Sequence, residues 1–260
     1  IVVTADIYSS AAFAVDFYIN DDMPNYTQTQ REQRLRIIRL AESVHNYINE
    51  ADSLANTQYD GVNGRPLSDV YRYNSAAVGT KLAVDKMTYE MLLVAKEMYR
   101  DTNGAFNPAV YRLVDLWGFS SRIYSNGNFG LPYDRQVTAE EFWDNGYPLP
   151  EQKYVDAFSS ASFTDFSDQS VTLSAEDGKY YVTKNVRPAV VGSESYEQWL
   201  DLGGIAKGYV ADGIKAMFSD EQIDRYNVDV GSSSMVFGLN YNGGDNVMTI
   251  PDPFDPKSVL

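Results

Sequence analysis

Hydrophobic positions follow helical spacing in three segments of the chain. In residues 31–50 apolar side chains recur every three or four positions, which predicts an amphipathic helix with Ile37, Ala41, Val44 and Ile48 facing inward. A second helix is predicted from Lys86 to Tyr99, with Asp85 as its N-cap and an inward stripe of Met87, Met91, Val94 and Met98. A third helix is predicted from Ile205 to about Phe218.

Alternating or β-rich runs predict strands between and around these helices. We expect strands within residues 1–22, a hairpin over 170–183 that turns at 176–178, a short strand at 196–202 and a strand running from 246 into a Pro-rich turn. Residues 227–240 are expected to form either a strand pair or one bent strand. Residues 120–150, rich in Gly, Asn, Pro and Tyr, are expected to form a long surface excursion. Because no steady βαβ rhythm occurs, the order favours an α+β fold, a mixed sheet with packed helices in a single domain over 1–260.

Charge limits the partners of the protein. The formal net charge is -15 over 260 residues, which repels DNA, RNA and anionic lipid, so we expect no nucleic-acid partner. The same field repels phosphate, so a phosphate site would need its own local positive charge. No apolar run reaches the roughly 18 residues of a membrane helix, so no membrane-spanning segment is expected.

The chain contains no cysteine and one histidine, His45, which lies in the first predicted helix as an ordinary surface or packed side chain. Disulfides, thiol catalysis and thiolate or multi-histidine metal sites are therefore excluded. A metal here would be a hard cation with oxygen ligands, such as Mg²⁺. Twenty tyrosines, the absence of cysteine and the acidity suggest an exported bacterial protein, either secreted or a membrane-anchored lipoprotein.

The stretch WLDLGGIAKGYVAD, residues 199–212, has the order strand, Asp201, Gly203-Gly204, helix, with Lys207 one turn into the helix. Unpaired N–H groups and a partial positive charge at a helix N-terminus attract phosphate, and glycines let it approach the backbone. The pattern is neither a P-loop nor G-x-G-x-x-G. A tight turn whose glycines serve only packing is the alternative.

Residues 201–212 match at every position the signature of the FAD:protein FMN transferases, the ApbE family, and the chain resembles that family along its length. TNGAFNPAVYRLVDLWGF at 102–119 and SDVYRYN at 68–74 resemble two further family segments in the expected order. VGSSSMVFG at 230–238 and TIPDPFDP at 249–256 stand where the family has a Gly-Gly turn and an Asp-Pro stretch.

This resemblance implies an ApbE-like fold that binds FAD and Mg²⁺ and transfers FMN to a Thr or Ser hydroxyl of a target protein, releasing AMP. It places Gly203 and Gly204 at the pyrophosphate, with Lys207 neutralising phosphate charge. Asp201 and Asp212 would anchor the turn and polar groups of the ligand. Asn74 would face the flavin or the metal, and the Ala206 carbonyl would contact the metal. Lys207 and Asp201 are the candidate catalytic residues.

Structural alternatives remain open for several of these residues. Asp201 could be a helix N-cap and Asp212 a carboxylate on a helix surface. Trp117 in the 102–119 segment is expected to pack rather than to bind ligand.

The chain departs from the family pattern in two places. Ser232 and Ser233 replace the commoner Gly and amide or acid of the family, where hydroxyls could still bind the cofactor. Family segments that supply an Asp and a Thr to Mg²⁺ would follow Leu260, so the resemblance predicts a domain without its C-terminal portion. A FAD-binding protein or FAD hydrolase without transferase activity is therefore one alternative. An exported carbohydrate-binding module is another, since aromatic residues are 13% of the chain.

Overall fold

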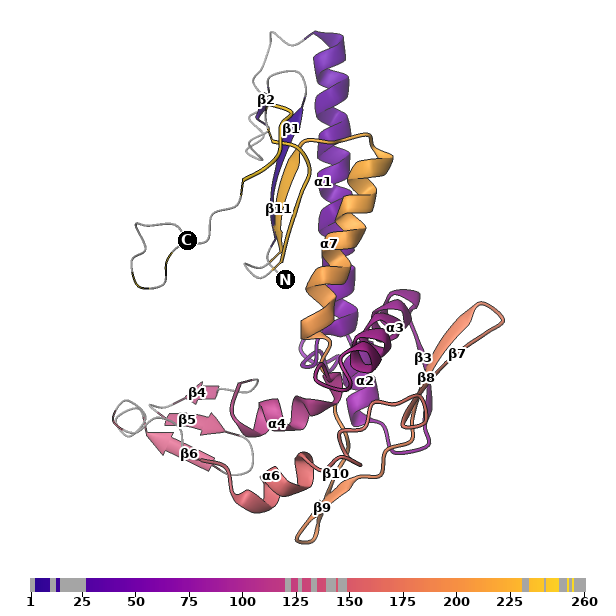
Figure 1. The fold of residues 1–260 in the computed structure, drawn as a ribbon, viewed down its shortest axis with the longest axis vertical. Helices are drawn as coiled ribbons and strands as arrows, with labels where there is room; N and C mark the ends of the chain where they lie inside the picture. The colour runs from indigo at the N-terminus through magenta and orange to yellow at the C-terminus, as the bar shows by residue number, and fades with distance from the viewer. Residues whose placement is uncertain are drawn as a thin grey trace. The chain divides into compact units, whose positions relative to one another are not determined.

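The computed structural model describes residues 3–9, 13–14, 27–119, 123–125, 128–131, 135–138, 144, 149–230, 234–240, 242–247, 252 and 254. These residues form two compact units, one comprising Ile1–Glu50 with Lys207–Leu260 and the other Ala51–Ala206. The division passes through helices α1 (Gln28–Ala55) and α7 (Gly203–Asp220). Helices and several small sheets occur together, which confirms the α+β class (Figure 1). The single domain over 1–260 stays a prediction.

The sheet of the first unit has the strand order β12-β11-β1-β2. Its strands are β1 (Val3–Ser9), β2 (Phe13–Ala14), β11 (Tyr226–Val230) and β12 (Ser234–Phe237), and every neighbouring pair is antiparallel. This confirms strands near the N-terminus and the strand pair within 227–240. The predicted strand from residue 246 lies largely outside the described residues.

In the first unit, α7 lies beside α1 (Figure 1). A Cβ on Gly213 of α7 would collide with the Tyr47 side chain of α1, so the absence of a side chain there permits close packing. The Tyr47 and Tyr209 rings stack at 6.5 Å, and Phe218 packs edge-on against Tyr226 at 4.7 Å, which joins α7 to the sheet. The predicted inward face of α1 is largely confirmed, but within residues 31–50 the described buried residues are Ile37, Leu40, Val44 and Ile48, and Ala41 is only half-buried.

The second unit contains most of the remaining elements. Its helices are α2 (Asp69–Ser75), α3 (Lys86–Asp101), the 3-10 helix η1 (Pro108–Val110), α4 (Tyr111–Leu116) and α6 (Gln152–Phe158). Its strands are β3 (Lys81–Val84), β4 (Ile123–Ser125), β5 (Asn128–Leu131), β6 (Arg135–Thr138), β7 (Val171–Glu176), β8 (Lys179–Lys184), β9 (Ala189–Val191) and β10 (Glu194–Tyr196). They form the antiparallel sheets β3-β8-β7, β4-β5-β6 and β10-β9.

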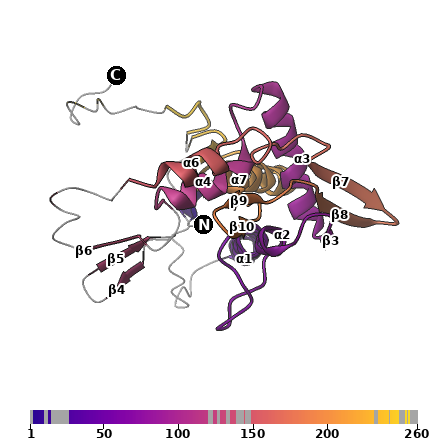
Figure 2. The ribbon, with the colours of Figure 1, turned by 90° about the horizontal axis from the view of Figure 1, so that it is seen from below.

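Helix α3 lies beside the β3-β8-β7 sheet (Figure 2), where the Tyr89 and Tyr180 rings are 5.0 Å apart. Its predicted N-cap is confirmed, because the Asp85 carboxylate accepts the Met87 N–H at 2.8 Å. The predicted methionine stripe is half wrong. Met87 and Met91 are buried, but Val94 and Met98 are exposed, and the remaining buried positions are Thr88, Leu92, Ala95 and Lys96. The inward face is rotated because Lys96 reaches backbone carbonyls of the loop before β7.

The predicted hairpin is confirmed as β7 and β8. Asp177 and Gly178 form its turn with φ angles of 51° and 73°, values that a two-residue hairpin turn of this kind requires and that glycine adopts without strain. The 120–150 segment contains the antiparallel β4-β5-β6 sheet rather than only loop, and its other residues lie largely outside the described part.

Two further predictions were wrong. The strand expected at 196–202 ends at Tyr196 in β10, and residues 197–202 belong to no strand. Trp117 is 43% exposed, because α4 directs Leu116, which is fully buried, into a cluster with Phe158 and Phe163, and Trp117 follows at the helix end. Among the described helices, none is both long and apolar enough to cross a membrane.

Candidate functional site

The chain approaches the glycine turn through residues 197–202, and a side chain takes the place of a neighbouring strand there. The Asn74 amide nitrogen donates to the Leu200 carbonyl at 3.0 Å, and its amide oxygen accepts the Leu200 N–H at 2.7 Å. Asn74 is only 4% exposed and Leu200 1%. A buried peptide group must find partners, and here one asparagine satisfies both of them, so the segment stays extended without sheet pairing.

The fully buried side chain of Gln198, in the same segment, provides a second set of contacts that fix it. It accepts a hydrogen bond from the Tyr73 hydroxyl at 3.0 Å and donates to the carbonyls of Phe163 and Asp165 at 2.7 and 3.1 Å. Burial raises the pKa of Tyr73, so the phenol remains a neutral donor. Adjacent residues of α2, Tyr73 and Asn74, therefore bind alternate residues of the 197–202 segment.

Asp201 lies near the end of the segment and binds the first turn of helix α7. Its N–H donates to the Pro108 carbonyl at 2.9 Å, and its carboxylate accepts the Gly203 N–H at 2.7 Å. The carbonyl of Leu202 accepts the N–H groups of Ile205 and Ala206, so Leu202 is in the N-cap position and Asp201 lies one residue before the cap that its structural alternative predicted. The Asp201 carboxylate still satisfies a first-turn N–H, and its role toward a ligand stays a prediction. The helix begins at Gly203, two residues earlier than expected, so both glycines lie in its first turn.

One backbone donor of this first turn has no acceptor in the part of the chain that the structure describes. The N–H groups of Ile205 and Ala206 donate to the Leu202 carbonyl, at 2.9 and 2.8 Å, and that of Gly203 to Asp201. The Gly204 N–H donates to no acceptor among the residues that the structure describes, and Gly204 is exposed. A single exposed donor at a helix N-terminus suits an anionic oxygen.

Gly204 also packs closely against an aromatic ring. A Cβ built there would lie 3.0 Å from Cε2 of Phe106, closer than nearly all real contacts. The packing interpretation therefore holds for Gly204, because a side chain there would crowd Phe106, and the phosphate interpretation stays a prediction. A Cβ on Gly203 would face only the Asp201 carboxylate, at 3.1 Å.

The remaining predicted site residues are distributed as follows. Ala206 is buried in the first turn of α7. Lys207, half-buried, and Asp212, exposed, follow on the same helix in the part that belongs to the first unit. Asp212 is thus a surface carboxylate as its structural alternative predicted. Ser232 and Ser233 lie outside the described residues.

Lys184, which was not predicted from the sequence, contacts the backbone of Asn74. Lys184, at the end of β8, is fully buried, and its ammonium donates to the carbonyls of Ala76 at 2.9 Å and Asn74 at 3.3 Å. Burial lowers its pKa to about 8, although Glu197, 3.7 Å away, opposes the shift. The signal was present in the sequence, because alternation along β8 places Lys184 on the same face as the buried Val182.

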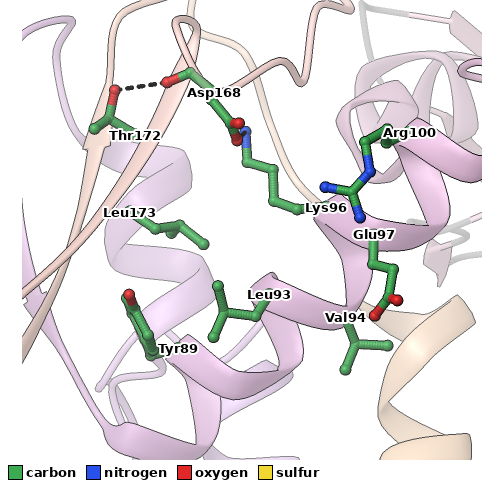
Figure 3. Close-up of a pocket in the computed structure, with 9 residues that line it drawn as sticks. All are labelled: Tyr89, Leu93, Val94, Lys96, Glu97, Arg100, Asp168, Thr172 and Leu173. Carbon is green, nitrogen blue, oxygen red and sulfur yellow. Dashed lines mark hydrogen bonds and ion pairs between the residues drawn. The ribbon is translucent and has the colours of Figure 1, made fainter.

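A separate pocket of about 540 Å³ lies between α3 and β7 (Figure 3). Its wall is formed by Tyr89, Leu93, Val94, Lys96, Glu97, Arg100, Asp168, Thr172 and Leu173, none of which is a predicted site residue. The buried Lys96 ammonium donates to the carbonyls of Phe166 and Ser167 at 2.6 and 2.7 Å and lies 3.6 Å from Asp168. Its hydrogen bonds are directed to the protein itself, so the pocket carries no ligand assignment.

A metal site would need several ligand side chains close together. Within the ranges that the structure describes, no three His, Asp or Glu residues are grouped so that they could hold a metal ion. The described part of the chain therefore supplies no carboxylate cluster to which Mg²⁺ can be assigned, and the metal contact of the Ala206 carbonyl stays a prediction.

Comparison with known proteins identifies the relatives of this arrangement. The sequence model of the ApbE family matches residues 25–260. The chain belongs to the ApbE family. The match covers the whole second unit, most of the first and the whole glycine turn, and it does not favour the carbohydrate-binding alternative.

Named relatives agree with this assignment. The chain is 22% identical over 225 residues to a protein of Escherichia coli strain K12 named FAD:protein FMN transferase, covering 86% of this chain and 53% of that protein. A Treponema pallidum protein of the same name is 28% identical over 205 residues, covering 78% of this chain and 47% of that protein. The chain thus spans about half the length of these relatives.

Solved structures show the same fold. The flavin transferase ApbE of Vibrio cholerae superposes with a TM-score of 0.59 at 19% identity, covering 89% of this chain and 58% of that one. The apo flavinyl transferase ApbE of Pseudomonas stutzeri gives a TM-score of 0.57 at 21% identity, covering 81% and 56%. The predicted ApbE-like fold is confirmed.

Proposed function

We propose that this protein is an FAD:protein FMN transferase, which uses FAD as donor and a Thr or Ser hydroxyl of a target protein as acceptor. Membership of the ApbE family and the names of its relatives support the reaction class. The observation that carries the proposal to this chain is the exposed Gly204 N–H, which has no acceptor among the described residues and lies in the first turn of α7.

In this proposal the FAD pyrophosphate lies at the N-terminus of α7. The Gly204 N–H donates to a phosphate oxygen, and the helix dipole adds partial positive charge, which offsets the acidity of the molecule. Asp201 holds the Gly203 N–H at 2.7 Å and so fixes the first turn. Lys207, four residues after Gly203 on the same helix, supplies the positive side chain. Asp212, Ser232 and Ser233 stay predicted ligand contacts.

Asn74 has an indirect role in this arrangement. Both heteroatoms of its amide bind the Leu200 backbone, so the side chain fixes the segment before the turn instead of pointing a free amide at the flavin. The flavin would lie next to the turn that Asn74 stabilises.

The reaction is a displacement at phosphorus. The acceptor hydroxyl oxygen bonds to the FMN phosphorus, the bond from that phosphorus to the bridging oxygen breaks, AMP leaves with that oxygen, and the hydroxyl proton passes to solvent. Positioning and charge stabilisation contribute most in such a step, so a chain without cysteine and with one surface histidine is compatible with it. Mg²⁺ would supply further charge neutralisation when bound.

The test is incubation of the full chain with FAD, Mg²⁺ and a Ser/Thr-containing segment of a candidate target. Flavin-labelled peptide, detected by fluorescence and mass spectrometry, together with AMP is the expected result. AMP and FMN without labelled peptide would assign FAD hydrolysis instead. FAD binding without any product would assign a flavin-binding protein, and no binding would overturn the proposal.

We also propose an extracytoplasmic location, on the basis of composition alone. Fractionation of cells that express the full-length protein would test this, and recovery in the cytoplasmic fraction alone would contradict it.

A further inference from the structure

Two buried lysines in the second unit have nearly the same surroundings. Lys184 donates to the carbonyls of Asn74 and Ala76, lies 4.6 Å from the Tyr73 ring centre and 3.7 Å from a Glu197 oxygen. Lys96 donates to two carbonyls of the loop before β7, lies 4.4 Å from a ring centre and 3.6 Å from a carboxylate oxygen. Burial lowers the pKa of each to about 8.

The two lysines differ in what they join. Lys96 fastens α3 to the loop before β7, whose Phe163 and Asp165 carbonyls accept from Gln198, whereas the Leu200 backbone is bound by Asn74. The Lys184 ammonium lies against the end of α2 and against Glu197, the first residue of the extended segment. These are the two pieces of chain that the Asn74 amide also connects. A cation near the last carbonyls of a helix is favourable, so the ammonium holds the end of α2 in place.

We propose that Lys184 is a positioning residue for FAD binding. It fixes the backbone of α2 at Asn74, the Asn74 amide fixes Leu200, and Leu200 is followed directly by Asp201, whose carboxylate holds Gly203. The ammonium touches no ligand in this scheme. The expected effect on FAD binding rests on the proposed function, but the contacts that link Lys184, Asn74 and Leu200 belong to the protein without ligand.

The chain of contacts is short and continuous. Lys184 Nζ to the Asn74 carbonyl is 3.3 Å, the Asn74 amide to Leu200 is 2.7 and 3.0 Å, and the Asp201 carboxylate to the Gly203 N–H is 2.7 Å. All of these groups belong to the second unit, and Lys184, Asn74 and Leu200 are each less than 5% exposed. Such groups have no water to replace a lost partner, so loss of the ammonium leaves the Asn74 and Ala76 carbonyls without this donor. The change therefore acts on the end of α2, which the Asn74 amide connects to Leu200.

The first test needs no ligand. Amide hydrogen exchange is measured in Lys184→Met and in the matched control Lys96→Met, with the Met91 amide of α3 as reference. We expect the Leu200 amide to exchange about tenfold faster, relative to Met91, in Lys184→Met than in wild type, an opening of local rather than global kind. In Lys96→Met that ratio should stay at its wild-type value. Equal ratios in the two variants would overturn the inference.

The second test measures the FAD dissociation constant by flavin fluorescence. Lys184→Met should weaken binding about tenfold, while Lys96→Met, with a similar loss of stability, should change it less than twofold. If Lys184→Met does not fold, Glu197→Gln takes its place. This variant removes the charge partner of the ammonium and keeps the shape of the Glu197 side chain, so it should give a smaller effect in the same direction. Unchanged FAD affinity and unchanged Leu200 exchange in Glu197→Gln would contradict the proposal.

The two tests separate the inference from the proposed function. If wild type binds no FAD but Lys184→Met still loosens Leu200 selectively, the structural link from Lys184 to Leu200 stands, while the transferase proposal and the consequence for FAD binding fail. If wild type binds FAD and Lys184→Met binds it equally well, the role of Lys184 is wrong, and the transferase reaction still depends on the product assay described above.

Discussion

The side-chain amide of Asn74 and the backbone of Leu200 exchange two hydrogen bonds, at 2.7 and 3.0 Å, across 126 positions of sequence. Two paired residues of an antiparallel sheet form the same pair of bonds. A single side chain thus substitutes for a strand at the point where the chain must reach the first turn of α7 in a defined position. Sheet pairing would continue on both sides of Leu200, whereas this contact leaves Asp201 available to bind the first turn of the helix.

Asn74→Ala is expected to lower the free energy of unfolding by roughly 1–3 kcal/mol, because it leaves the buried N–H and C=O of Leu200 without partners. Denaturant unfolding followed by fluorescence measures this. Asn74→Asp keeps the shape and one of the two bonds, so it should retain part of the stability. Asn49→Ala, on the exposed face of α1, is the control and should change stability by less than about 0.5 kcal/mol. A neutral Asn74→Ala would show that the pair is dispensable.

Sequence analysis predicted those parts of the fold that depend on neighbouring residues. The Asp85 cap and the Asp177-Gly178 turn are local, since side chain and backbone partners lie within a few residues. The expected strand at 196–202 failed because alternation shows which residues are buried but not what pairs with the backbone. Its buried positions were correctly apolar at Leu200 and Leu202, but the partner of Leu200 comes from α2.

Gly204→Ala is expected to raise the FAD dissociation constant at least tenfold. The methyl group would lie 3.0 Å from Phe106 Cε2 and would stand between a phosphate and the Gly204 N–H. The control is Gly208→Ala on the same helix, where a Cβ would meet nothing within 4 Å. That change should leave FAD affinity unaltered and stabilise the helix by up to about 1 kcal/mol, because alanine has the higher helix propensity. Binding titrations and thermal unfolding report both, and equal FAD affinity in the two variants would argue against a phosphate at Gly204.

Lys207→Glu should weaken FAD binding more than Lys207→Met does, because it adds repulsion to the loss of attraction. We expect a several-fold loss for the neutral change and more than tenfold for the charge reversal, with a gap that narrows in high salt as screening increases. Lys215→Glu, exposed on the same helix, makes the same change in net charge and should have a small effect. If Lys207→Glu and Lys215→Glu weaken binding equally, the effect belongs to net charge and not to a contact of Lys207.

The candidate site was predictable as a string but not as a geometry. The signature at 201–212 located the glycines, and the amide hydrogen bonds of Asn74 that determine its role became visible only in three dimensions. Lys184 was missed for a related reason. A lysine at the end of a strand is usually exposed, and its burial here depends on carbonyls at the end of α2, which are more than 100 residues away in sequence.

The two buried lysines make the stability of the protein depend on pH in a definite direction. The pKa of Lys184 is lowered to about 8 by burial, while the same side chain in the unfolded chain keeps its ordinary value of 10.5. Between these values the unfolded state binds more protons than the folded state. The free energy of unfolding therefore rises with pH across this window, and the cost of holding a buried ammonium is fully present below about pH 8.

Lys184→Met removes this contribution, so the comparison of wild type with the variant isolates it. From pH 7.5 to 9.5 the free energy of unfolding of wild type should rise relative to that of the variant by roughly 1–2 kcal/mol. The hydrogen bonds of the ammonium exist only in wild type. Tyrosines that titrate nearby are common to both proteins and cancel in the difference. Denaturant unfolding at several pH values measures it. A difference that stays flat, or that falls as pH rises, would mean that the folded protein holds the Lys184 proton as tightly as the unfolded chain does.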